Sequence, residues 1–315
     1  MADSSSKTAF PTKSIQAQTQ TRPGLATKLT PQPIYTQLEH FHSETGKPNL
    51  NEYIGTGKLK NKKVLITGGD SGIGRSAALM MAREGADVSI VFLEEELPDA
   101  KEVEAQIESE SKQLGNGSSC HLIAMDLMNR ENCFSAVEKH LDRYGRIDVL
   151  VNNAARQDLC ENFENIDLDQ VEKTFRLNVF AMFSLTKAAL PHMRRGGSII
   201  NTTSVAAYNG TPNLVDYAST KASIVTFTKS LALQLAPRGI RVNAVAPGII
   251  YTVFQAATGG QAPETVEAIG TDEAPLGRPG HPSEVGPAYV FLASHESSYA
   301  TGSVIHITGG VEMHG

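Results

Sequence analysis

From Lys62 onward, short runs of apolar residues alternate with longer amphipathic stretches. The runs are continuously apolar and rich in β-branched residues, which is typical of strands buried on both faces of a parallel sheet. They predict strands at 63–67, 87–92, 121–125, 147–152, 197–202, 241–246 and 303–308.

The stretches between these runs show helical spacing. Alternating strands and helices build a parallel sheet that is covered on both faces, so we expect a three-layer α/β fold. No repeat of 20–50 residues is visible, and we interpret residues 61–315 as a single domain. The predicted helices cover residues 72–84, 97–114, 130–144, 168–193 and 215–236.

Residues 1–60 differ from the rest, because they are rich in Gln, Thr and Pro and show neither a helical nor a strand period. Alone, such a segment buries too little apolar area to fold. Three interpretations remain: a disordered tail, a transit peptide, which the missing Arg-rich face disfavours, or an arm that packs on a neighbouring subunit. The anchors of such an arm would be Leu25, Leu29, Ile34, Tyr35 and Leu38.

Composition narrows the function classes. The net charge of −6 argues against general affinity for nucleic acid, and no apolar run approaches the length of a membrane span. The first residues lack the apolar block of a secretory signal, and Cys120, Cys133 and Cys160 have no metal-ligand spacing. We therefore expect a cytoplasmic protein with reduced thiols, no metal site, and neither nucleic acid nor membrane as a partner.

A glycine-rich turn follows the first strand of the predicted sheet. "TGGDSGIG", residues 67–74, leaves the strand and starts a helix near Gly72. Glycines permit positive φ and let a pyrophosphate approach the backbone, while the helix N-terminus offers free N–H groups and a partial positive charge. The turn therefore predicts a dinucleotide-binding site.

A phenol and an ammonium lie one helical turn apart in "DYASTK". Tyr217 and Lys221 are i and i+4 on a predicted helix, so they share a face. A nearby cation stabilises phenolate, so we expect the pKa of Tyr217 to move from about 10 toward working pH, where acid–base catalysis is efficient.

"TGGDSGIG", "NNAA", Ser204 followed by "YxxxK", and "APG" occur in one order that resembles the classical short-chain dehydrogenase/reductase family. The resemblance covers about residues 60–312 and is nearest to the glucose and ribitol dehydrogenase homologues. It implies a Rossmann-type, doubly wound, seven-stranded parallel sheet and hydride transfer between a nicotinamide cofactor and an alcohol, ketone or aldehyde. The catalytic residues that it implies are Asn178, Ser204, Tyr217 and Lys221.

In the family, Ser204 would orient the substrate oxygen, Tyr217 would transfer the hydroxyl proton, and Lys221 would bind the nicotinamide ribose. Asn178 would hold a water in a proton relay. It also falls on the inward stripe of the predicted helix 168–193, where a core amide bonded to backbone is the alternative.

The resemblance also implies the cofactor contacts. Phe92 occupies the usual acidic position after the second strand, whereas Asp70 in the turn would repel a 2′-phosphate. NAD(H) or NADP(H) would bind, and we favour NAD(H). Asp126 resembles the acid that accepts from adenine, although a helix N-cap is an alternative. The implied contacts are Gly68, Asp70, Ser71, Gly72, Ile73, Gly74, Phe92, Asp126, Leu127, Asn153, Ala154, Ala155, Tyr217, Lys221, Pro247, Gly248, Ile250 and Thr252.

Residues 249–280 have weak periodicity, and in this family such a segment closes over the substrate, with Gly259–Gly260 as a possible hinge. A small-molecule alcohol or ketone is the expected substrate. The Ala-rich faces of the long helices favour a homotetramer. The candidates for the pocket wall are Arg156, Gln157, Tyr208, Tyr251, Val253 and Phe254.

Two other functions fit the same fold. One is a nucleotide-binding regulator without turnover, although such a protein has no need of Ser204 or Tyr217. The other is an epimerase or dehydratase that works through a transient ketone.

Overall fold

The computed structural model describes residues 8–11, 15–270 and 273–311, and a seven-stranded parallel sheet forms its centre. The sheet order is β5-β4-β3-β6-β7-β8-β9, so the predicted doubly wound sheet is confirmed. The order reverses between β3 and β6, and in such sheets ligands bind at the carboxyl ends beside this switch point. The strands are β3 (Lys63–Thr67), β4 (Asp87–Phe92), β5 (Cys120–Ala124), β6 (Ile147–Asn152), β7 (Met193–Thr202), β8 (Arg241–Pro247) and β9 (Val304–Ile307).

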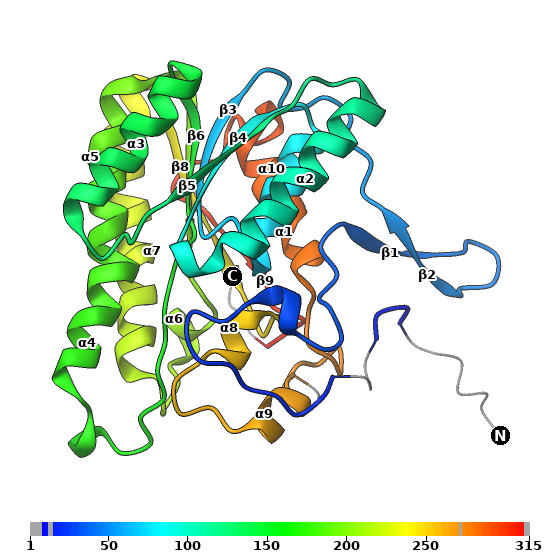
Figure 1. Cartoon of the computed structure of the whole chain (residues 1–315), viewed down its shortest axis with the longest axis vertical. Helices are drawn as coiled ribbons and strands as arrows, with labels where there is room; N and C mark the ends of the chain where they lie inside the picture. The colour runs from blue at the N-terminus through cyan, green and yellow to red at the C-terminus, as the bar shows by residue number, and fades with distance from the viewer. Residues whose placement is uncertain (1–7, 12–14, 271–272, 312–315) are drawn as a thin grey trace.

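Helices cover both faces of the sheet and complete the three predicted layers (Figure 1). One face carries α1 (Gly72–Arg83), α2 (Leu97–Leu114) and α10 (Pro282–Ala293). The other carries α3 (Arg130–Tyr144), α5 (Met182–Ala189) and α7 (Val215–Leu235). Within the described chain, no helix has both the length and the apolarity of a bilayer span.

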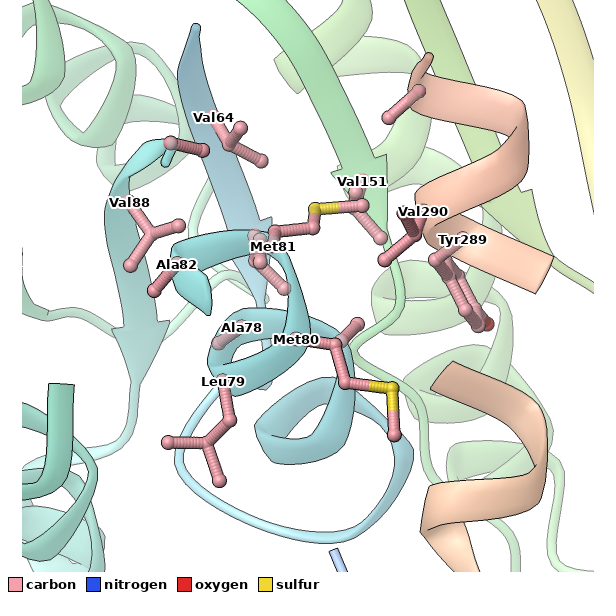
Figure 2. Packing of buried hydrophobic residues seen from close by; sticks show 14 of the residues in the cluster. Val64, Ala78, Leu79, Met80, Met81, Ala82, Val88, Val151, Tyr289 and Val290 are labelled. Atoms are coloured by element: carbon pink, nitrogen blue, oxygen red, sulfur yellow. The ribbon is translucent and has the colours of Figure 1, made fainter. Parts of the chain in front are cut away.

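The core between α1, α10 and the sheet explains the uninterrupted apolar runs. Figure 2 shows Met81 of α1 reaching toward Val151 of β6, while Tyr289 and Val290 of α10 pack from the other side. Val64 and its neighbours in β3 are fully buried, because side chains that point to either face of the strand meet a helix layer. Burial of each such side chain contributes about 1.5–3 kcal/mol.

One predicted helix is wrong in its extent, and one helix was not predicted. The helix expected over 168–193 is divided into α4 (Leu168–Phe175), a π-helical turn at Arg176–Ala181, and α5, and β7 already begins at Met193. The stretch that forms α10 was not recognised as a helix because it contains Gly286 and Pro287 and is apolar on nearly all sides. Burial of this helix overrides its weak propensity.

The N-terminal segment contains strands, contrary to the expectation that it has no strand period. β1 (Gln37–Phe41) and β2 (Pro48–Glu52) form an antiparallel hairpin whose tip projects away from the sheet (Figure 1). Its side chains are largely half-buried or exposed, so no apolar alternation marks it in the sequence.

The arm, by which we mean residues 15–36, lies along its own chain. Ala26 and Leu29 form a buried cluster with Val253 and Ala256, beside α8 (Val253–Ala256). The carboxylate of Asp99 accepts hydrogen bonds from the backbone N–H groups of Ala26 and Thr27 at 2.5 and 3.1 Å. The predicted anchors Leu29, Tyr35 and Leu38 thus pack on the α/β domain of the same chain.

Candidate active site

A cleft of about 700 Å³ opens at the carboxyl edge of the sheet. Residues that follow β3, β4, β5, β6, β7 and β8 line it, because the ends of parallel strands meet at one edge. Among the predicted cofactor contacts, Gly74 alone is outside the lining. The cleft brings together Gly68, Asp70, Ser71, Gly72, Ile73, Phe92, Asp126, Leu127, Asn153, Ala154, Ala155, Tyr217, Lys221, Pro247, Gly248, Ile250 and Thr252.

The glycine turn has the geometry of an anion cradle. Gly68 and Gly72 have φ values of +62° and +52°, which favour glycine. A Cβ on Gly74 would lie 1.8 Å from the carbonyl oxygen of Gly68, so Gly74 permits the turn to close under the cleft. Ser71 precedes α1 without a side-chain capping bond, which leaves the first N–H groups of the helix for a pyrophosphate.

Asp70 gives the cleft an acidic end. Its carboxylate is buried, and Oδ2 has no hydrogen-bond partner among the described residues. Burial raises the pKa of Asp70 to about 6 against the hydrogen bonds of its own backbone and Ser71. The neighbouring guanidinium of Arg75 lies 4.5 Å from the ring of Tyr35 and pairs with Glu102 at 3.2 Å, outside the cleft lining. An unpartnered carboxylate oxygen there fits a hydroxyl group of a ribose.

The residues that follow β6 make hydrogen bonds to the glycine turn and to the end of β3. The Thr67 hydroxyl accepts from the backbone N–H groups of Asn153 and Ala154, and the Asn153 amide donates to the carbonyl oxygen of Gly68 at 3.1 Å. These hydrogen bonds hold "NNAA", residues 152–155, against the glycine turn.

Asp126 does not cap a helix. Its carboxylate accepts from the N–H of Met128 at 2.9 Å, whereas Asn129 is the N-cap of α3. The N-cap alternative is therefore wrong. Asp126 is exposed and lines the cleft.

Ser204, Tyr217 and Lys221 meet below the end of β7. The hydroxyls of Ser204 and Tyr217 share a hydrogen bond. The Lys221 Nζ lies 5.3 Å from the centroid of the Tyr217 ring and donates to the carbonyl oxygen of Thr202 at 2.9 Å. Tyr217 and Lys221 are both buried, on one face of α7 as predicted.

The pKa of Tyr217 moves in the direction opposite to our expectation. Burial raises it to about 12, and the hydrogen bond from Ser204 offsets only part of this rise. Burial also lowers the pKa of Lys221 to about 7. The sequence indicated the pair but not its desolvation, which disfavours both the phenolate and the ammonium that would stabilise it.

Asn178 lies in the π-helical turn, and its amide is fully used by protein groups. Its Oδ1 accepts from the N–H of Arg156 at 2.8 Å, and its Nδ2 donates to the carbonyl oxygen of Arg156 and to the Thr220 hydroxyl, both at 3.0 Å. These bonds are those of the core-amide alternative. π-turns often occur at functional sites, and this one directs Asn178 inward.

The predicted pocket wall is correct in four of its six positions. Arg156, Gln157, Val253 and Phe254 line the cleft. Tyr251 does not: its hydroxyl donates to the carbonyl oxygen of Pro31 at 2.8 Å, so the side chain is buried under the arm.

Tyr208, the other wall candidate, also lies outside the cleft lining. Its ring packs against His306, with the centroids 4.8 Å apart.

Contact between the arm and the cleft was not predicted from the sequence. Arg22 and Pro23 line it, and Arg22 pairs with Asp158 at 2.7 Å. The proposed hinge Gly259 forms an isolated bridge with Asp158, and a Cβ there would lie 2.3 Å from the Asp158 carboxylate. No local motif marks these contacts, since they join distant segments.

Comparison with known proteins identifies relatives along nearly the whole chain. A family model described as enoyl-(acyl carrier protein) reductase matches residues 68–312. The oxidoreductase YhdF of Bacillus subtilis is 49% identical over 289 residues, which are 92% of each chain. NADPH-dependent aldehyde reductase 1, chloroplastic, of Arabidopsis thaliana is 46% identical over 86% of this chain and 93% of its own.

The fold has solved counterparts. A short-chain dehydrogenase from Burkholderia cenocepacia, crystallised with NADP, has a TM-score of 0.73 and 30% identity. The match covers 81% of this chain and 99% of that one, so about one fifth of this chain lies outside the match.

Proposed function

Since the chain belongs to the short-chain dehydrogenase/reductase family and is an NAD(P)-dependent oxidoreductase, we propose that it interconverts an alcohol and a ketone or aldehyde. The observation that carries this proposal is the buried group of Ser204, Tyr217 and Lys221 beside a cleft with a dinucleotide cradle. The name of the aldehyde reductase relative supports the same reaction class.

We assign each side chain a role in this reaction. Ser204 donates to the substrate oxygen and orients it, and the Tyr217 hydroxyl gives or takes the proton on that oxygen. The protonated form of Lys221 provides positive charge beside the phenol, which favours phenolate. The nicotinamide cofactor, when bound, supplies or accepts the hydride. Asn178 fixes the backbone of Arg156 and so the wall of the cleft.

A substrate panel combined with Tyr217→Phe tests this function. Alcohols, aldehydes and ketones are screened with both cofactors by nicotinamide absorbance, with product analysis to detect epimerisation or dehydration. We expect turnover that falls about a thousandfold or more in Tyr217→Phe, because the proton donor is gone, while cofactor affinity measured by calorimetry is retained. Substantial turnover by the variant, or none by the natural protein on any substrate, would contradict the proposal.

We also propose that NAD(H) is preferred over NADP(H). The buried carboxylate of Asp70 supports this, because a 2′-phosphate would add negative charge beside it. Glu96 adds little repulsion near neutral pH, since burial and the charge of Asp70 raise its pKa to about 8. The names of one relative and one solved counterpart point instead to NADPH and NADP, so the two cofactors must be compared directly.

Asp70→Asn separates the possibilities. We expect the natural protein to have a KM at least tenfold lower for NAD than for NADP, and the neutral variant to lose most of that difference. A natural preference for NADP would overturn this proposal and leave the reaction class intact.

A further inference from the structure

Two guanidinium groups lie on the side of the cleft where the arm meets the α/β domain. Arg22 of the arm and Arg156, which follows β6, both line the cleft. Both pair with Asp158: Arg22 binds Oδ1 at 2.7 Å and Oδ2 at 3.1 Å, and Arg156 binds Oδ2 at 2.7 Å. We infer that Arg22 and Arg156 form a subsite for an anionic group of the substrate, a carboxylate or a phosphate ester. This inference rests on the proposed oxidoreductase function and specifies its substrate class.

The charge balance of this cluster favours an anion. Burial alone would raise the pKa of Asp158, but the hydrogen bonds and charges of Arg22 and Arg156 outweigh it and hold the pKa below its ordinary value. Asp158 therefore carries one negative charge against two positive charges. The cluster of three side chains has a net charge of about +1 in a partly buried setting, where screening by water is weak.

Donor capacity remains after Asp158 is satisfied. A guanidinium has five N–H donors, and Arg156 Nε is buried without a hydrogen-bond partner among the described residues. Arg22 additionally donates to the carbonyl oxygen of Gln157. A carboxylate or phosphate that accepts from the remaining N–H groups would satisfy an otherwise unpaired polar atom, and Arg suits planar anions.

Hydrogen bonds within the α/β domain connect the cluster to Tyr217. Asn178 binds the backbone of Arg156 through both its amide oxygen and its amide nitrogen. Asn178 also donates to Thr220, whose hydroxyl donates to the backbone carbonyl of Tyr217 at 2.6 Å. Arg156 is thus held in fixed relation to the first turn of α7.

The 249–280 segment connects the cluster to the same tyrosine from the other side. The ring centroids of Phe254 and Tyr217 are 6.1 Å apart, and a Cβ on Gly24 would lie 2.8 Å from the neighbouring Val253. Arg22 precedes Gly24 by two residues and lines the same cleft as Phe254. A compact substrate could therefore place its carbonyl at Tyr217 and its anionic group at the two arginines.

A purely structural clamp would explain less of the arrangement. The arm is already anchored by the buried cluster of Ala26 and Leu29 and by the hydrogen bonds to Asp99, without any arginine.

Glu273 of the 249–280 segment also lines the cleft, and its negative charge would oppose the binding of an anion. If Glu273 dominated, a cationic substrate would be preferred, so the experiment includes one.

The test compares aldehydes that differ in charge. Succinate semialdehyde is compared with butanal, and glycolaldehyde phosphate with glycolaldehyde, which separates a carboxylate from a phosphate as the recognised group. Betaine aldehyde serves as the cationic substrate. We expect kcat/KM to be at least tenfold higher for one anionic aldehyde than for its neutral partner, mainly through KM, and betaine aldehyde to be the poorest of the set.

Substitution of the arginines assigns the preference to the subsite. Arg22→Gln and Arg156→Gln should each lower the anionic-to-neutral ratio of kcat/KM about tenfold, and Arg22→Lys should restore part of it because the charge returns. Arg176→Gln removes an arginine that pairs with Glu172 on the exposed face of α4 and its neighbouring turn, and should leave the ratio unchanged.

The outcomes separate the two proposals. If the natural protein reduces neutral aldehydes without preferring an anionic one, or if each arginine variant loses anionic and neutral turnover in equal proportion, the subsite is refuted and the oxidoreductase function stands. If no aldehyde or ketone of any charge is reduced and no corresponding alcohol is oxidised, the proposed function itself fails.

Discussion

At the scale of single residues, the burial of Lys221 opposes the positive charge that its proposed role requires. Burial lowers its pKa from 10.5 to about 7, so the folded state disfavours the ammonium that the unfolded chain holds at neutral pH. Between these two values the unfolded state binds more protons than the folded state. The free energy of unfolding contributed by this group therefore rises as pH increases from about 7 toward 10.5.

This linkage predicts the behaviour of Lys221→Met. The variant should lose turnover. It should also lack the contribution of Lys221 to the slope of unfolding free energy against pH, which reaches about 1.4 kcal/mol per pH unit for one proton. Urea unfolding at a series of pH values between 7 and 9 measures the slope. Tyr217→Phe is the matched control because it removes activity and keeps Lys221. Equal slopes in all three proteins would show that Lys221 is not desolvated as described.

The grouping of Ser204, Tyr217 and Lys221 was predictable from the sequence and their pKa values were not. Ser204 follows β7 by two residues, and Tyr217 and Lys221 lie near the start of α7, so their spacing in the chain carries much of their geometry. The direction of the Tyr217 pKa depends on how many atoms from distant segments exclude water, which spacing does not encode. Arg22 escaped prediction for the same reason, since its partner Asp158 is far along the chain.

At the scale of elements, the close approach of the arm to α8 predicts a sensitive glycine. Gly24 has a φ of +79°, and a Cβ there would lie 2.8 Å from Val253 and 2.9 Å from Ala257. Gly24→Ala therefore adds overlap to backbone strain. We expect a loss of about 1–3 kcal/mol of stability in urea unfolding, together with a higher KM for substrate because the wall of the cleft shifts.

Gly57→Ala is the matched control for this change. Gly57 has a φ of +84°, and a Cβ there would meet nothing within 4 Å, so its substitution carries the strain alone. Gly24→Ala should be clearly more destabilising than Gly57→Ala and should alone raise KM. Equal effects of the two substitutions would show that the arm does not press on α8.

The docking of the arm should also depend on pH through His281, which precedes α10. Its Nδ1 accepts from the N–H of Ile34 at 3.2 Å, and its ring stacks on Phe10 with centroids 5.0 Å apart. Burial lowers the pKa of His281 to about 4, while Glu284 and Arg278 act in opposite directions on it. The Tyr251 ring packs edge-on against it.

Because the folded state holds His281 neutral, stability from this group should be lost as pH falls from about 6.5 toward 4. His281→Asn keeps an acceptor near Nδ1 without titrating in this range. The variant should show a slope of unfolding free energy against pH that is smaller by up to about 1.4 kcal/mol per unit near pH 5. His40→Asn, at an exposed histidine, controls for the substitution itself. An unchanged slope in His281→Asn would contradict the assigned contact.

The elements themselves followed from the sequence wherever one physical signal dominated. Continuous apolar runs indicated all seven strands of the main sheet to within a few residues, because the inner strands are buried on both faces and the edge strands β5 and β9 are at least half-buried. The π-turn around Asn178 and the Pro-containing α10 were not foreseen, since tertiary packing overrides local preference in both. The β1–β2 hairpin is too polar to leave a pattern.

At the scale of the whole molecule, exposed apolar residues on α5 and its neighbours support the homotetramer that we propose. Phe180 and Phe183 are 53% and 52% exposed, and the Phe183 ring lies 4.6 Å from that of Phe227 on α7. Leu233, also on α7, is 81% exposed. Single exposed apolar residues are ordinary, but aromatic residues gathered on two adjacent helices are typical of an interface.

Light scattering measures the outcome directly. The natural protein should have a mass near four times the 33.8 kDa of one chain, and Phe183→Glu should shift the mass to smaller species, because it places a carboxylate in the buried contact. Phe41→Glu is the matched control: Phe41 is 58% exposed on the β1–β2 hairpin, away from the α5–α7 face, and its substitution should leave the mass unchanged. A monomeric mass for the natural protein, or a tetramer that withstands Phe183→Glu, would place the assembly surface elsewhere or remove it. Since the arm lies over its own chain, a monomeric Phe183→Glu variant should still contain the complete cleft, and its KM for substrate tests whether the site is built within one chain.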